Sequence, residues 1–226
     1  MMPPNCKYAL LLTSMPRHPQ QFFSAGQTPI SKLQLDQRLG LLDAKDADEL
    51  QRIQNLVHGS QFKDKPDQAI IKSCQESMAL MTDAFLKRLV LWHWEVRTVL
   101  SALRLRHQGA QAPERHSFPG FGVWPDAIEK NWHTGDFGIG RQLPWIVEAE
   151  RLLTENKPFE LEKFLLDLIW QHYASIGSRH FFDFSAVVIY VLRWHLTSRW
   201  LNYKADTAMA RFDELIGAGL EGCAIV

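Results

Sequence analysis

The histidines are the first residues whose chemistry could define a function, because imidazole binds metals and transfers protons near neutral pH. The chain has nine of them. Helical metal ligands usually recur at positions i and i+4, but four residues after His93 stands Arg97. His107, His116 and His133 flank or lie in one segment, where a metal site would need only convergence in space. Exposed or hydrogen-bonded histidines explain this pattern more simply, so the sequence predicts no metal and no cofactor.

The segment 135–140 contains closely spaced glycines and an Asp-Phe-Gly triplet, both of which occur in nucleotide-binding proteins. A kinase would also need a Gly-rich loop, a lysine on a strand and a His-Arg-Asp loop, and a dinucleotide fold would need a preceding strand. The sequence contains neither set, so we interpret the segment as a structural turn before a helix. Since no serine lies in a Gly-x-Ser-x-Gly elbow either, we predict no catalytic residue.

Arginine and tryptophan form the clearest candidate binding surface, because both anchor protein interfaces. Arginines crowd the end of a predicted helix, and the segment that follows is rich in aromatic rings and glycine. The predicted partner-binding residues are Arg97, Arg104, Arg106, Trp124, Trp132, Arg141 and Trp145. Two other interpretations stay open: the arginines stabilise the helix dipole, or they pair with acidic residues of the same chain.

A long helix must position these side chains. Apolar residues recur every three or four positions, with one extra four-residue step near Phe85, and neither Pro nor Gly interrupts residues 68–108. The pattern predicts one helix over this range, or two collinear helices, ended by Gly109. The stripe consists of Ile71, Cys74, Met78, Met81, Phe85, Leu89, Trp92, Val96, Val99 and Leu103.

The rest of the chain also has mainly helical patterns. We expect further helices at 29–39, 46–58, 125–131, 144–155, 158–177, 184–203 and 206–216. The apolar run 7–14 is predicted to form a strand or a short extended segment. The predicted fold class is therefore an all-α multi-helix bundle with an ordered aromatic, Gly-rich loop. It forms one domain, 1–226, or two lobes, 1–110 and 141–226, joined by the loop 110–143.

Composition limits the functional class. The chain has 226 residues, 46% of them hydrophobic, and a formal net charge of +0. A neutral total argues against a protein built to bind nucleic acid. The three cysteines are far apart, which suggests reduced thiols in the cytoplasm. The most apolar run, at 184–196, is too short and too charged to span a membrane, so we expect no membrane span.

Several motifs together resemble one protein family, the C-type central-stalk subunits of V-type/A-type ATPases, which are called d in eukaryotes. The stretch Trp94–Gly109 is similar to a helix end of that family, which contains an acidic residue, then Arg-Thr, then Arg and then Gly. A bacterial C-like branch of the family resembles this chain in four further places. These are Tyr8–Pro16, Asp136–Trp145, Asp183-Phe184 and Arg199-Trp200.

The resemblance implies a helical protein without catalytic activity of its own. Members of the family connect the rotating central shaft to the membrane rotor ring, so the implied partners are these two parts of the ATPase. The implied location is cytoplasmic, at the inner face of the cell membrane through the complex. An orphan helical enzyme or an adaptor with a site in the loop 110–143 is the alternative.

Overall fold

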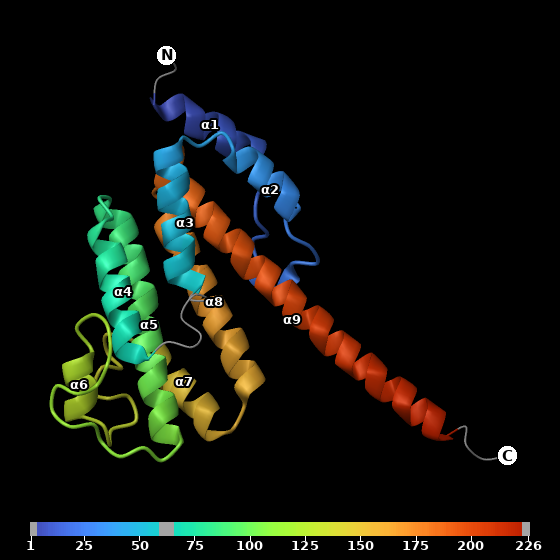
Figure 1. Ribbon diagram of the computed structural model, residues 1–226. Coiled ribbons are helices and arrows are strands. Elements are labelled where there is room, and N and C mark those ends of the chain that lie inside the picture. Colours follow the sequence, from blue (N-terminus) through green and yellow to red (C-terminus); the bar gives the residue numbers. More distant parts are fainter. Residues whose placement is uncertain (1–3, 59–65, 223–226) are drawn as a thin grey trace. The chain divides into compact units, whose positions relative to one another are not determined.

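The protein is all-α in the part of the chain that the structure describes, which confirms the predicted fold class. This computed structural model describes the backbone of residues 4–58 and 66–222 and the side chains of 7–58 and 66–203, and these residues contain no strand. Besides one 3-10 turn at Phe22–Ser24, the helices are α1 (Pro4–Ser14), α2 (Lys32–Leu39), α3 (Ala44–His58), α4 (Asp67–Ala79), α5 (Ala84–His107), α6 (Pro125–Lys130), α7 (Trp145–Thr154), α8 (Pro158–Gly177) and α9 (Phe184–Gly222) (Figure 1).

The contacts between residues divide the chain into two compact units. Unit 1 combines Met1–Leu41 with Tyr173–Val226, and unit 2 is Leu42–His172. These boundaries differ from the two predicted lobes, because the loop 110–143 lies wholly inside unit 2 and the N-terminal segment belongs with α9.

The N-terminal segment of unit 1 is a helix, so the predicted strand or extended segment is wrong. Leu11, inside α1, and Met15, directly after its last residue, are both buried. The Tyr8 ring lies 6.2 Å from the Phe184 ring of α9. A short apolar run has the same composition in a buried helix as in a buried strand, and here packing on α9 selects the helix.

The irregular segment between α1 and α2 is held on α9 by hydrogen bonds to backbone carbonyls. Tyr190 donates its hydroxyl proton to the carbonyl of Pro16 at 2.9 Å, and the Trp194 indole N–H donates to the carbonyl of Ile30 at 2.8 Å. Helix α2 then begins at Lys32 after a Ser31 capping box, three residues after the predicted start at position 29. The proline-rich segment therefore gains order from α9 and not from its own secondary structure.

Asp183 caps α9, which begins at Phe184 as the sequence predicts. Its carboxylate accepts the N–H of Ala186 at 2.8 Å. The backbone of α9 continues for 39 residues, so the separate closing helix predicted at 206–216 is wrong and its range belongs to α9.

Unit 2 contradicts the prediction of one helix, or two collinear helices, over 68–108. Helix α4 ends at Ala79, α5 begins at Ala84, and the two run in opposite directions (Figure 1). Met81, in the turn between them, is buried. The four-residue step that the sequence shows near Phe85 spans this turn, so the apolar spacing continues although the helix does not.

Asp83 provides the cap that starts α5, and replacing it with Ala should destabilise unit 2 by about 1 kcal/mol. Its carboxylate accepts the N–H groups of Phe85 at 2.8 Å and Leu86 at 3.0 Å, two donors that have no partner inside the helix. Urea denaturation followed by circular dichroism measures the change. Asp83→Asn keeps an acceptor oxygen and should lose less; equal losses in the two variants would contradict the capping role.

The core of unit 2 forms where α5 packs on α7. Val99, Leu103 and Ile146 are buried there, and Phe118, Trp132 and Phe137 from the loop between the helices join the same cluster. The aromatic loop is thus ordered, as predicted, and it is also part of the hydrophobic core of unit 2.

Candidate functional site

The loop between α5 and α7 is clamped to α5 by one arginine side chain. The Arg106 guanidinium lies 4.4 Å above the centroid of the Phe137 ring and 3.8 Å from the Glu150 carboxylate. It donates hydrogen bonds to three backbone carbonyls, those of Trp132, Thr134 and Gly135. Because a guanidinium carries five donors in a rigid fork, one side chain can fix several turns of a loop.

The Asp-Phe-Gly segment is a structural turn, as predicted. The Asp136 carboxylate accepts the backbone N–H groups of Gly138 at 2.9 Å and Gly140 at 3.1 Å. Phe137 has a φ of 50° and Gly138 a φ of 68°, which reverses the chain and directs the Phe137 ring into the core. The Asp136 carboxylate and these two glycine N–H groups therefore satisfy one another inside the turn.

A second set of contacts fixes the loop to the middle of α5. The buried Thr98 hydroxyl accepts the N–H of Phe121 at 2.9 Å and donates to the carbonyl of Trp94 at 2.8 Å. Gly122 has a φ of 78°, and a Cβ there would collide with the Glu95 carboxylate. Burial raises the pKa of Glu95, although the nearby Trp124 side chain and Val123 backbone oppose the shift.

Five of the seven predicted partner-binding residues make contacts inside the chain. Three have roles inside the chain: Arg97 donates to the carbonyl of Val57, Arg106 clamps the loop, and the buried Trp132 donates its indole N–H to the carbonyl of Ala110. Trp124 and Trp145 are half-buried and pack against the unit 2 core. The inward-facing Arg97 and Arg106 therefore donate mainly to backbone carbonyls and less to acidic side chains.

Arg104 and Arg141 behave differently from the other five. Both are exposed, and within the described residues neither side chain makes a hydrogen bond or an ion pair. Of the predicted surface, these two cations are the ones available to a partner.

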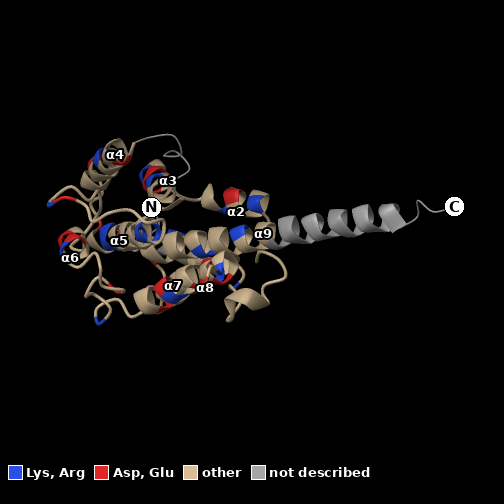
Figure 2. Cartoon of the chain, turned by 90° about the horizontal axis from the view of Figure 1, so that it is seen from below, with Lys and Arg blue, Asp and Glu red and all other residues tan. Residues whose placement is uncertain are grey.

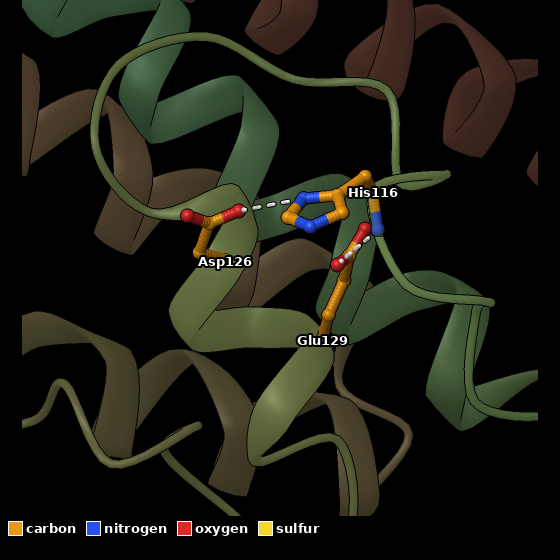
Figure 3. Close-up of side chains that lie close together, drawn as sticks. All are labelled: His116, Asp126 and Glu129. Carbon is orange, nitrogen blue, oxygen red and sulfur yellow. Dashed lines mark hydrogen bonds and ion pairs between the residues drawn. The ribbon is translucent and has the colours of Figure 1, made fainter.

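One cluster of metal-ligating side chains lies in the same loop. His116, Asp126 and Glu129 each offer a ligand atom, and these three atoms lie within 4.8 Å of one another. In Figure 3 the Asp126 carboxylate faces the His116 ring, and Glu129 reaches the His116 backbone. His116 Nδ1 lies 3.7 Å from Asp126 Oδ1, and both side chains are 68% exposed.

Glu129 is fixed more firmly than its neighbours in the cluster. One carboxylate oxygen accepts the N–H of His116 and the other that of Phe118, both at 2.8 Å. Slight burial raises the pKa of Glu129. The backbone N–H groups of Phe118, His116 and Ser117 and the nearby His116 ring lower it by more, so the net shift is downward. His116 stood out in the sequence as a candidate ligand, whereas Asp126 and Glu129 did not, although their i, i+3 spacing on a predicted short helix was a usable signal.

Two histidines, His93 on α5 and His172 on α8, lie beside Trp92 in another part of unit 2. The ring of Trp92 stacks on His172 with centroids 3.6 Å apart and meets His93 edge-on at 5.2 Å. Burial lowers the pKa of His93 to about 3, and Arg97, His172 and His58 add to the effect. Burial also lowers the pKa of His172 to about 4, so both rings are neutral at pH 7.

One described hollow, of about 260 Å³, is lined by side chains of α3 and α4. Gln51 and Asn55 bond to each other at 2.9 Å, and Arg52 pairs with Glu49, so much of its polar lining is already partnered. The hollow therefore offers weaker grounds for a site than the loop does.

Comparison with protein-family models, with curated proteins and with solved structures found no match. Lys and Arg are interspersed with Asp and Glu over the described helices (Figure 2). Among the described residues, no helix combines the length and the apolar character needed to cross a membrane.

Proposed function

We propose that this chain is a non-catalytic, C-like central-stalk component of a prokaryotic V/A-type rotary ATPase. In that role it connects the rotor shaft to the membrane rotor ring during proton or sodium transport. It would then act in the cytoplasm, at the inner face of the cell membrane, held there by the complex. The observation that carries the proposal is the order of the family-like motifs along the sequence.

The positions of these motifs in the fold support the proposal. The Asp136 turn leads into α7, Asp183 caps α9, and Thr98 fixes the loop to α5. These residues build helix starts and loop contacts, which is what an adaptor needs in order to present a rigid surface. The exposed, unpaired Arg104 and Arg141 are the candidate contacts on that surface.

Arg104→Glu should weaken binding to the partner by about 2 kcal/mol, or roughly 30-fold, because it places like charge against an acidic partner. The measurement is a quantitative pull-down of the host ATPase components by the purified chain. Arg88→Glu is the matched control, since Arg88 is also an exposed arginine on α5.

The two variants separate the surface from the function. Unchanged binding of Arg104→Glu, with the fold intact by circular dichroism, would remove Arg104 from the interface. If the wild-type chain captures neither shaft nor ring proteins, the ATPase assignment itself is wrong.

The alternative, an orphan enzyme or adaptor with a site in the loop 110–143, has one observation in its favour. The His116, Asp126 and Glu129 side chains converge there. An enzyme would show turnover by the purified chain that is lost in Asp126→Asn, whereas the ATPase proposal expects no turnover.

A further inference from the structure

We infer that His116, Asp126 and Glu129 form a binding site for a divalent cation of the zinc class. The three side chains come from two separate elements: His116 lies in the loop, and the two acids lie on α6. The site is independent of the ATPase proposal, because none of its residues belongs to the predicted partner surface.

The spacing of the donor atoms is close to what one ion requires. Zinc binds imidazole nitrogen and carboxylate oxygen at about 2.0–2.2 Å, so two ligands on a tetrahedral ion are roughly 3.4 Å apart. The His116 Nδ1 to Asp126 Oδ1 distance is 3.7 Å, and all three donor atoms are within 4.8 Å. Small rotations of these exposed side chains would close the remaining gap.

Glu129 is oriented in advance by the two backbone N–H groups that it binds. A carboxylate oxygen has two lone pairs, so each oxygen keeps one for a metal while it accepts one hydrogen bond. Hydrogen bonds of this kind hold metal ligands in place and sharpen metal affinity. The backbone of His116, with a φ of 61°, places its imidazole beside the same two carboxylates.

The charge balance of the cluster favours a cation. Within the described residues, neither Asp126 nor Glu129 pairs with a lysine or an arginine, and His116 is their nearby basic group. Two carboxylates therefore share one imidazole, which leaves negative charge that a divalent ion would neutralise.

The donor set selects the ion. Mg²⁺ and Ca²⁺ prefer all-oxygen sites, whereas imidazole with carboxylate suits zinc and its first-row neighbours. Three protein ligands leave a coordination position for water. A bound ion would tie the segment around His116 to α6 in addition to the existing Glu129 hydrogen bonds.

The test is isothermal titration of the untagged full chain with ZnCl₂, repeated with MgCl₂. We expect a single site that binds zinc at least tenfold more tightly than magnesium. His116→Asn and Asp126→Asn should each weaken zinc binding at least tenfold. Asn suits position 116 because it tolerates the left-handed backbone, so the loop should keep its conformation.

His133→Asn is the matched control, since His133 is an exposed histidine of the same loop that lies outside the cluster. It should bind zinc as the wild type does. Zinc binding that survives both His116→Asn and Asp126→Asn, for example at thiols, would overturn the inference. Absence of measurable binding by the folded wild type would overturn it as well.

Discussion

Replacing Phe137 with Ala should lower the free energy of unfolding of unit 2 by about 3–5 kcal/mol, the usual cost of removing a buried aromatic ring. The Phe137 side chain is 0% exposed, and its ring lies 5.7 Å from Trp132 and under the Arg106 guanidinium. Its loss would leave a cavity in the core and remove the surface on which the clamping arginine rests. The backbone strain at a φ of 50° is shared by both residues, since Ala also carries a Cβ.

Urea denaturation followed by tryptophan fluorescence measures the effect of Phe137→Ala. Val123→Ala is the control, because Val123 lies in the same loop but is 73% exposed. That variant should stay within about 0.5 kcal/mol of wild type. A Phe137→Ala protein within about 1 kcal/mol of wild type would show that the loop is not part of the core.

Acid should destabilise unit 2 through His93, by about 3 kcal/mol between pH 7 and pH 4. Burial lowers the pKa of this ring to about 3 in the folded protein, against 6.5 as the ordinary value. Below pH 6.5 the unfolded chain binds a proton that the folded chain excludes. Stability is therefore complete above pH 6.5 and is lost progressively as the pH falls toward 3.

Two neighbouring groups modify the profile. His172, whose pKa burial lowers to about 4, adds a smaller loss in the same direction because it is partly exposed. Glu95 acts in the opposite direction. Burying its charged carboxylate costs free energy, which raises its pKa, and protonation at low pH removes this cost. The histidine terms should dominate, because the shift at His93 is the largest of the three.

The variant His93→Gln isolates the contribution of this ring, because glutamine is polar but does not titrate. Its free energy of unfolding should fall less steeply between pH 6.5 and pH 4 than that of wild type. His133→Gln, a change at an exposed histidine, should follow the wild-type curve. Parallel curves for His93→Gln and wild type would mean that His93 does not drive acid unfolding.

Local signals predicted most helices well. Pro158 and Gly177 bound α8 as the sequence indicates, and Asp183 caps α9. These boundaries depend on the backbone chemistry of single residues: proline suits a first helical turn, glycine a C-terminus, and aspartate an N-cap. Such preferences act within a few residues, so they can be recognised without the fold.

The break between α4 and α5 could not be predicted from apolar spacing alone. The spacing continues through Met81, whose side chain is buried in the turn itself. A stripe at intervals of three and four residues records which side chains are buried, but it does not record whether the chain reverses between them. The Asp83 cap was a local sign of the new helix start that the stripe concealed.

For the candidate site, the sequence determined the residue types and tertiary structure decided their use. An arginine near a Gly-rich loop was visible in the sequence, but Arg106 binds backbone carbonyls, and the side chains left exposed are Arg104 and Arg141. The sequence alone also could not bring His116 to Asp126 and Glu129, because that contact requires the loop to return to α6. Composition and spacing thus determined the all-α class and the ordered aromatic loop. Which charged groups face inward depended on long-range packing, because a buried cation is stable only where the fold supplies its acceptors.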